Sequence, residues 1–349
     1  MERRPLLIME HHRVTVRHRE SPRDRAPSRP LPRPPDWTGS ADLRSEPDTA
    51  DNTKARTESD LKSMLSGDQP YVERQDGNGS EMSKYIATEL RKLVLEMAYA
   101  GSSVHIGCAF SIIDILAVLY RNHLRYPDND PEAITRDYLV LSKGHGVMAQ
   151  YACLYEKRWL SRDDLRNYFG DGTTLKGLSD AHVKGCEVTS GSLGHGLSVA
   201  VGMALAAKLI NTDQKCYVVV GDGEMNEGPI WEAMLFACHN KLDNLIIIVD
   251  VNGYQGLGKT AEILDLGNFQ QKFVAFGFET ISVDGHSECE IDQALEKLKQ
   301  GNNGMPKAII ANTVKGKGVS FMEKDNAWHY ARLTEETFGL AMAELEKVT

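Results

Sequence analysis

The chain has no apolar run long enough to cross a membrane, no excess of basic residues and no opening stretch that suits a signal peptide. Its longest apolar runs have the length of strands, well below the roughly 20 residues that a membrane-spanning helix needs. Its 349 residues carry a net charge of −9, which argues against an extended nucleic-acid surface. We therefore expect a cytoplasmic protein that binds neither membranes nor nucleic acids.

Paired cysteine motifs are also missing. The six cysteines are scattered without a CxxC pair or a zinc-ligand spacing, and several lie in apolar strand or helix runs. Such cysteines are typically free, buried thiols in a reducing compartment.

Proline is scarce except at the start of the chain. Residues 1–35 contain seven of the 13 prolines together with nine arginines, a composition that cannot bury enough surface to offset chain entropy. We read residues 1–81 as a disordered Arg/Pro-rich extension. A transit peptide is an alternative, but Glu2, Glu10, Glu20 and Asp24 argue against it. A natural start near Met82 is a further alternative.

Residues 82–349 have the pattern of one regular α/β domain. Helices are expected near residues 83–100 and 194–210, and another after Ser111 with Asp114 as its capping partner. The strands expected in this region are 136–142, 216–220, 245–249, 279–283 and 308–313. This alternation predicts a doubly wound parallel sheet with helices on both faces.

Two of these strands end in residues that suit a metal ion. Gly221, Asp222 and Gly223 follow the strand 216–220, and Asn252 follows the strand 245–249. One helix lies between the two strands, so they should run parallel and present both side chains at the carboxyl edge of the sheet. Two hard oxygens beside glycines suit Mg²⁺ or Ca²⁺ that holds a diphosphate.

Five blocks in a fixed order resemble the amino-terminal part of transketolase, especially of forms split across two chains. The resemblance covers about residues 83–330 and implies the thiamine diphosphate-binding fold, limited to its diphosphate domain. The blocks are Ser103–Gly107, Leu141–Gly146, Glu187–Gly196, the GDG…N unit, and Val314–Gly318.

The resemblance implies the ligands of thiamine diphosphate and Mg²⁺, for which Ca²⁺ or Mn²⁺ can stand in. Asp222, Asn252 and the main-chain carbonyl of Tyr254 would ligate the metal ion. Gly223 and His145 would contact the diphosphate.

Further positions carry over to the remainder of the cofactor and to the substrate. His105 and His329 match histidines that face the substrate and the reactive carbon, and Glu227 matches a carboxylate that links the two cofactor sites across a subunit interface. His195 is expected to pack near that interface. The residues expected along the aminopyrimidine ring are Gly191, Ser192 and Leu193.

The chain ends at Thr349 with only one α/β domain. By the resemblance, the glutamate that activates the pyrimidine ring belongs to a second domain, so another polypeptide must supply it. We expect an α2β2 assembly with a carboxyl-terminal transketolase subunit that carries the pyrimidine-binding domain. The reaction implied is transfer of a two-carbon ketol unit from a ketose to an aldose.

Two alternatives stay open at this point. The α subunit of a 2-oxoacid dehydrogenase shares the GDG…N unit, although the histidine-bearing blocks favour transketolase. A scaffold or regulatory subunit that retains the fold is the non-catalytic alternative.

Two departures from the family pattern involve apolar residues. Leu178 stands where the family has a histidine that contacts a substrate hydroxyl, which suggests a modified sugar as substrate. Ile106 replaces a usual proline, for which we expect only a local backbone effect.

A competing motif overlaps the metal site. Gly253–Thr260 fits GxxxxGK[ST], the pattern of a nucleotide-binding phosphate loop. Such a loop requires a helix that starts at Lys259 with its amino end toward the phosphates. The following segment 261–266 is short, which argues against nucleotide hydrolysis.

Overall fold

A computed structural model describes residues 85–301 and 303–347 of the chain. The expected extension at residues 1–81 and the alternative start at Met82 lie outside these residues. The boundary at residue 82 therefore stays a prediction.

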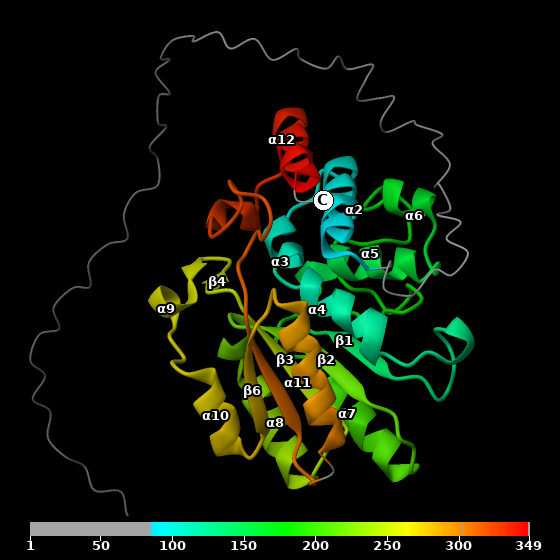
Figure 1. Cartoon of the computed structure of the whole chain (residues 1–349), viewed down its shortest axis with the longest axis vertical. Coiled ribbons are helices and arrows are strands. Elements are labelled where there is room, and N and C mark those ends of the chain that lie inside the picture. Colours follow the sequence, from blue (N-terminus) through cyan, green and yellow to red (C-terminus); the bar gives the residue numbers. More distant parts are fainter. Residues whose placement is uncertain (1–84, 302, 348–349) are drawn as a thin grey trace, which may run out of the picture. The chain divides into compact units, whose positions relative to one another are not determined.

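The centre of the fold is a sheet whose five strands all run parallel, in the order β1-β2-β3-β7-β6 (Figure 1). This confirms the predicted parallel sheet, with bounds that differ by at most two residues from those expected. The strands are β1 (Tyr138–Leu141), β2 (Cys216–Gly221), β3 (Leu245–Val251), β7 (Lys307–Asn312) and β6 (Glu279–Asp284).

The central strands form because their Val and Ile runs are apolar on both sides. In β2, Tyr217 and Val219 belong to one buried cluster, whereas Val218 and Val220 belong to the other. Successive strand side chains point to opposite faces, so each face of the sheet has its own core.

Helices cover both faces, as expected of a doubly wound sheet. The residues of α7 (Gly196–Leu209), α8 (Gly228–His239) and α10 (Phe269–Phe276) pack with one cluster. The other cluster contains residues of α4 (Ile113–Val118), α5 (Val147–Glu156) and α11 (Glu288–Gln300).

A further group of helices packs with the same buried cluster as α4, α5 and α11. In Figure 1, α2 (Ala87–Ala100) and α12 (Glu335–Glu346) lie side by side, and α3 (Ile106–Phe110) packs against α2. The short helix α6 (Arg162–Arg166) also contacts α2. This group supplies the loops before α3 and after β7, which carry histidines of the candidate site.

The expected capping pair at the start of α4 is wrong. The first turn of α4 has no side-chain cap. Asp114 is instead buried, with its Oδ2 2.5 Å from Arg91 Nη2 and 2.7 Å from His286 Nδ1. The Ser111 hydroxyl donates to Asp250 Oδ2 at 2.8 Å. Both side chains face the interior, where a charge needs a partner, and this need outweighs a local cap.

All six cysteines are free, and Cys108, Cys153, Cys186 and Cys216 are buried. The expectation of free, mostly buried thiols is thus confirmed. Separately, no helix within residues 85–301 and 303–347 combines the length and apolar character needed to cross a bilayer.

Candidate active site

The register of the sheet brings Asp222 and Asn252 to the same edge. Gly221 in β2 pairs with Asp250 in β3, so the residues that follow leave the sheet beside one another. The backbone amide of Asp222 donates to the carbonyl of Asp250 at 3.1 Å. The amide of Gly253, next to Asn252, donates to Asp222 Oδ2 at 2.7 Å. The predicted meeting of these two loops is therefore seen in the structure.

The Asp222 carboxyl group is buried, with 2% of the residue exposed. Its Oδ1 accepts a second backbone hydrogen bond, from the amide of Gly223 at 2.8 Å. Burial, followed by the nearby charge of Asp250, raises the pKa of Asp222 to about 7. A cation placed beside this carboxyl would favour its ionised form.

A polar network centred on Asp250 lies beneath the two loops. Asp250 is fully buried and forms an ion pair with Lys143. It also accepts hydrogen bonds from the hydroxyls of Ser111 and Thr313. Asn252 Nδ2 donates to Asp250 Oδ2 at 2.9 Å, which fixes the orientation of the Asn252 amide. The network therefore holds an expected metal ligand in place.

The segment after Asn252 folds as a hairpin rather than a phosphate loop. β4 (Tyr254–Gln255) pairs antiparallel with β5 (Gly258–Lys259), and α9 (Thr260–Ile263) has only four residues. Lys259 is exposed and lies 3.2 Å from Glu262 Oε1. The GxxxxGK[ST] motif is thus not followed by the helix that a nucleotide site would need.

The residues expected to bind the metal ion offer oxygen donors of different chemical types. Among the described residues, no three His, Cys, Asp or Glu side chains group as a metal site. The expected set has one carboxylate, the Asn252 amide oxygen and the Tyr254 carbonyl, which are hard oxygens of the kind Mg²⁺ prefers together with ligand phosphates. Asn252 Oδ1 accepts from the Tyr254 amide at 3.0 Å, so these two residues share one tight turn.

The turn after Asp222 is closely packed against the hairpin. A Cβ atom at Gly223 would lie 2.7 Å from Gln255 Cβ, so only glycine fits. Gln255 Nε2 is buried and has no hydrogen-bond partner among the described residues. An unpaired buried donor beside the glycine turn suits an anionic ligand such as a diphosphate, so the residues present fit the group.

Three histidines expected at the site form one cluster. The rings of His105 and His145 have their centroids 4.7 Å apart, and those of His105 and His329 lie 5.1 Å apart. The backbone amide of His105 donates to the carbonyl of His329 at 3.1 Å. Three segments distant in sequence, before α3, after β1 and after β7, therefore converge.

All three imidazoles are held toward the neutral form. Burial, and then the neighbouring His145, lowers the pKa of His105 to about 4. Burial followed by Lys315 lowers the pKa of His329 to about 3. Burial also lowers the pKa of His145, with Lys143 as the second cause. These rings can donate and accept hydrogen bonds without carrying charge at neutral pH.

The loop expected along the aminopyrimidine ring is the most open part of the site. Gly191 has φ 139° and is partly buried, Leu193 is partly buried, and Ser192 is exposed. A Cβ at Gly191 would lie 2.7 Å from Leu178 Cδ1. Leu178, with 38% of the residue exposed, therefore covers the glycine of this loop and presents an apolar surface.

Glu224 is a buried residue that the sequence reading did not assign to the site. Its Oε1 accepts from the amide of Gly194 at 2.8 Å and from the hydroxyl of Ser142, and its Oε2 accepts from the amide of Gly221 at 3.1 Å. One carboxyl group thus braces the loop after β1, the end of β2 and the loop before α7. Burial raises its pKa.

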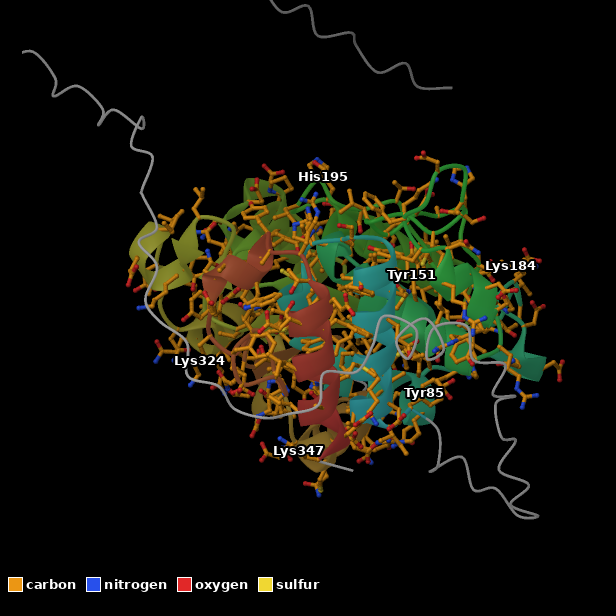
Figure 2. The ribbon with its side chains drawn as sticks, turned by 90° about the horizontal axis from the view of Figure 1, so that it is seen from above. Tyr85, Tyr151, Lys184, His195, Lys324 and Lys347 are labelled. Carbon is orange, nitrogen blue, oxygen red and sulfur yellow. The ribbon has the colours of Figure 1, made fainter. Side chains whose placement is uncertain are left out.

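Glu227 and His195 lie at the surface of the described chain. Glu227 precedes α8 and is exposed. His195 is exposed as well and lies at the upper margin of the ribbon in Figure 2. The structure does not bring either residue into the histidine cluster. Their expected roles at an interface stay predictions.

The positions of Asp250, Lys143 and Lys315 in the sequence could have indicated that these residues support the site. Asp250 follows the apolar run Leu245–Val249, and Lys143 and Lys315 each stand beside glycines in the blocks that resemble transketolase. Lys143 and Lys315 are both buried. A charged residue next to a core strand needs a buried partner, and that rule could have found this set.

Comparison with known proteins agrees with the geometry. Residues 82–345 match the family described as "Transketolase, thiamine diphosphate binding domain". The chain belongs to this family. The predictions of this fold and of a transketolase-type subunit are thereby confirmed.

Several members of the transketolase family are similar over most of this chain. The chain is 43% identical to the 6-deoxy-6-sulfo-D-fructose transketolase subunit SqwG of Clostridium sp. (strain MSTE9), over 75% of this chain and 95% of that protein. It is 38% identical to an apulose-4-phosphate transketolase subunit of Phocaeicola vulgatus, over 74% and 91%.

Solved transketolases are longer. The structure matches transketolase from Leishmania mexicana with a TM-score of 0.71 and 32% identity, covering 77% of this chain and 41% of that one. For transketolase from Campylobacter jejuni the TM-score is 0.70 at 33% identity, with 77% and 43% covered. The chain spans about two fifths of these transketolases.

Proposed function

We propose that this chain is the diphosphate-binding subunit of a two-component transketolase that depends on thiamine diphosphate and Mg²⁺. The complex would move a two-carbon ketol unit from a ketose to an aldose. The observation that carries the proposal is the convergence of the Asp222 and Asn252 loops at one sheet edge. The cluster of His105, His145 and His329 supports it.

The residues of the chain divide the work by chemistry. Asp222, Asn252 and the Tyr254 carbonyl would hold Mg²⁺, or Ca²⁺ or Mn²⁺ in its place, and Gly223 and His145 would contact the diphosphate. When bound, thiamine diphosphate supplies the reactive carbon and the electron sink for cleavage beside a ketose carbonyl.

The histidines bind and orient the substrate. His105 and His329 would face it as neutral imidazoles, which can hold a hydroxyl by donating and accepting hydrogen bonds. Burial keeps water from the inner side of these rings, and it is the first cause of their lowered pKa values.

A second chain completes the site in this proposal. Two parts of the site lie at or near the surface: the loop at Gly191, Ser192 and Leu193, and the carboxyl of Glu227. A carboxyl-terminal subunit with the pyrimidine-binding domain would cover them there. Two relatives that match over nearly their full length are themselves named as transketolase subunits. We infer an α2β2 complex with the cofactors at the interfaces.

We also propose a modified sugar as the substrate. Leu178 covers Gly191 with an apolar side chain, at the position where the sequence resemblance implies a histidine that contacts a hydroxyl. The two relatives are named for 6-deoxy-6-sulfo-D-fructose and apulose-4-phosphate.

Leu178→His tests this substrate assignment. In the two-chain complex it should shift relative turnover toward ordinary ketose phosphates by about tenfold, since one substrate hydrogen bond contributes about 1.5 kcal/mol. Competition assays with paired donors measure the shift, and Leu178→Met is the matched control. Equal ratios in Leu178→His and wild type would refute the assignment.

We place the enzyme in the cytoplasm. Six free cysteines, four of them buried, suit a reducing compartment. Fractionation of cells that express the native protein would check this placement.

The central test uses the complex. The chain that co-purifies with the native protein is identified by mass analysis, and the two are mixed with thiamine diphosphate and Mg²⁺. Wild type should transfer a ketol unit, and Asp222→Ala should lower turnover at least about 100-fold, because a metal ion contributes several kcal/mol. Glu232→Gln, on the exposed side of α8, is the control.

Two outcomes would overturn the proposal. Decarboxylation of a 2-oxoacid by the assembled complex would point to a dehydrogenase subunit. Equal behaviour of wild type and Asp222→Ala in every assay would point to a scaffold or regulatory subunit.

A further inference from the structure

We propose that Lys315 is a positioning residue that fixes His329 as the tautomer with its proton on Nε2, so that His329 donates a hydrogen bond to substrate rather than accepting a proton. The inference deepens the proposed function and rests on it for the identity of the substrate. The tautomer itself is a property of this chain and can be measured without activity.

Lys315 is buried with 0% of the residue exposed, in the loop that follows β7. Its stem runs beside the first turn of α3, where a Cβ at Gly107 would lie 3.0 Å from Lys315 Cγ. The amide of Gly316 donates to the carbonyl of Gly107 at 3.3 Å. Glycine at 107 therefore leaves the space through which the lysine reaches the histidine cluster.

The Lys315 amine has two partners at its end. Nζ lies 2.8 Å from His329 Nδ1 and 2.9 Å from Asn326 Oδ1. It also lies 5.7 Å from the centroid of the Tyr254 ring, a contact that favours a cation. An ammonium group has three donors and no acceptor. Burial lowers the pKa of Lys315 below its ordinary value, whereas the Asn326 oxygen and the Tyr254 ring favour its charged form. As an ammonium, Lys315 obliges His329 Nδ1 to accept, which places the single proton of the neutral ring on Nε2.

The other side of the ring faces the hairpin. A Cβ at Gly256 would lie 3.7 Å from His329 Nε2, and the Tyr330 hydroxyl lies beside the same glycine. The Nε2–H group therefore points away from Lys315 and from the Cys108 thiol, whose Sγ is 3.9 Å from Nδ1. Nε2 therefore lies on the hairpin side of the ring, opposite the nitrogen that contacts Lys315.

The ammonium also opposes a second proton on His329, since both charges would lie within hydrogen-bond distance. Burial and Lys315, in that order, lower the pKa of His329 to about 3. The titratable and charged groups around this ring are Lys315, Cys108, His105, Tyr330, His145 and Lys143. None of these groups is a carboxylate, which would favour the imidazolium form of His329.

The direct test is nitrogen NMR of the full chain with ¹⁵N-labelled histidine, with His329→Gln to assign the signals. Wild-type His329 should show a protonated Nε2 and an unprotonated Nδ1, and should not titrate between pH 5 and pH 8. A proton on Nδ1, or titration near the ordinary value of a histidine, would overturn the proposal.

Lys315→Met removes the donor but keeps a long apolar stem. It should mix the two tautomers of His329 and raise its pKa by about 1 or more, while Lys315→Arg should restore donation to Nδ1. Lys317→Met, in the same loop and partly exposed, is the matched control. If Lys315→Met does not fold, the tautomer of wild-type His329 and its retention in Lys315→Arg still test the proposal.

Activity separates this proposal from the proposed function. In the two-chain complex, Lys315→Met should lower kcat more than it raises KM, and Lys315→Arg should recover part of the loss. If wild type transfers no ketol unit but shows the expected tautomer, only the function fails. If wild type is active and the His329 signals are unchanged in Lys315→Met, only the role of Lys315 fails.

Discussion

The two ends of the candidate site are built in opposite ways. At the diphosphate end, Asp222 is 2% exposed, and Asp250 and Glu224 hold the surrounding loops from beneath. At the ring end, Ser192 and Glu227 are exposed. One end is braced within this chain, and the other is left for a second surface to cover.

The difference in burial between the two ends indicates which part of the site one chain forms alone and which part needs the complex. Buried carboxylates need internal partners in the folded chain, so the diphosphate end must be formed before any partner arrives. Exposed polar groups are hydrogen-bonded to water, so the open end of the site does not need the partner chain in order to be stable. We expect the chain to fold with its metal loops in place and to become active only when it is covered.

The strongest challenge to the braced end is Asp250→Ala. It leaves the buried Lys143 ammonium without its partner, which should lower the free energy of unfolding by ~3–5 kcal/mol. Urea denaturation of the isolated chain measures this. Adding Lys143→Met to the variant should recover part of the loss. A cost below about 1 kcal/mol would mean that the network does not brace the loops.

A smaller effect is expected from acid at the histidine cluster between the two ends. The pKa of His329 is about 3 in the folded chain against 6.5 for a free histidine, so the unfolded state binds the proton first as pH falls below about 6.5. Wild type should therefore lose stability there relative to His329→Gln, by about 1 kcal/mol between pH 7 and pH 5 once solvent screening of this partly exposed ring is discounted.

The acid effect is measured as the difference between the two unfolding free energies at several pH values. That difference should be constant above about pH 8, where the ring is neutral in both states. A difference that does not depend on pH would mean that His329 is solvated as an ordinary surface histidine.

The smallest effect on the isolated chain is expected at the open end. Glu227→Gln should change its unfolding free energy by no more than about 0.5 kcal/mol, like the matched control Glu232→Gln in α8, which begins directly after Glu227. With the partner chain, Glu227→Gln alone should weaken assembly by about tenfold, as measured by ultracentrifugation. Equal assembly of the two variants would place the interface elsewhere.

The fold was largely predictable from sequence because most of its strands are short apolar runs with a turn signal at their ends. The runs at Cys216–Val220 and Leu245–Val249 fixed the edge at which Asp222 and Asn252 meet. The hairpin at residues 254–259 could be excluded as a phosphate loop because no helix of sufficient length follows it.

The supports of the site were harder to predict, since their partners lie far apart in sequence. Glu224 joins three separate segments, and Asp250 pairs with Lys143 across 107 positions. Neither spacing has a periodic signature. The capping pair at Ser111 and Asp114 failed for the same reason, because long-range partners outcompeted a local bond.

His105 has φ 69° immediately before α3, a left-handed conformation that most side chains resist. A saturation library at this codon should therefore be poor in folded variants with Val, Ile or Thr. Asn and Gly should be enriched among the soluble clones, although neither restores an imidazole. The path by which evolution could exchange this residue is therefore narrow, and it is set by the backbone as much as by the chemistry of the ring.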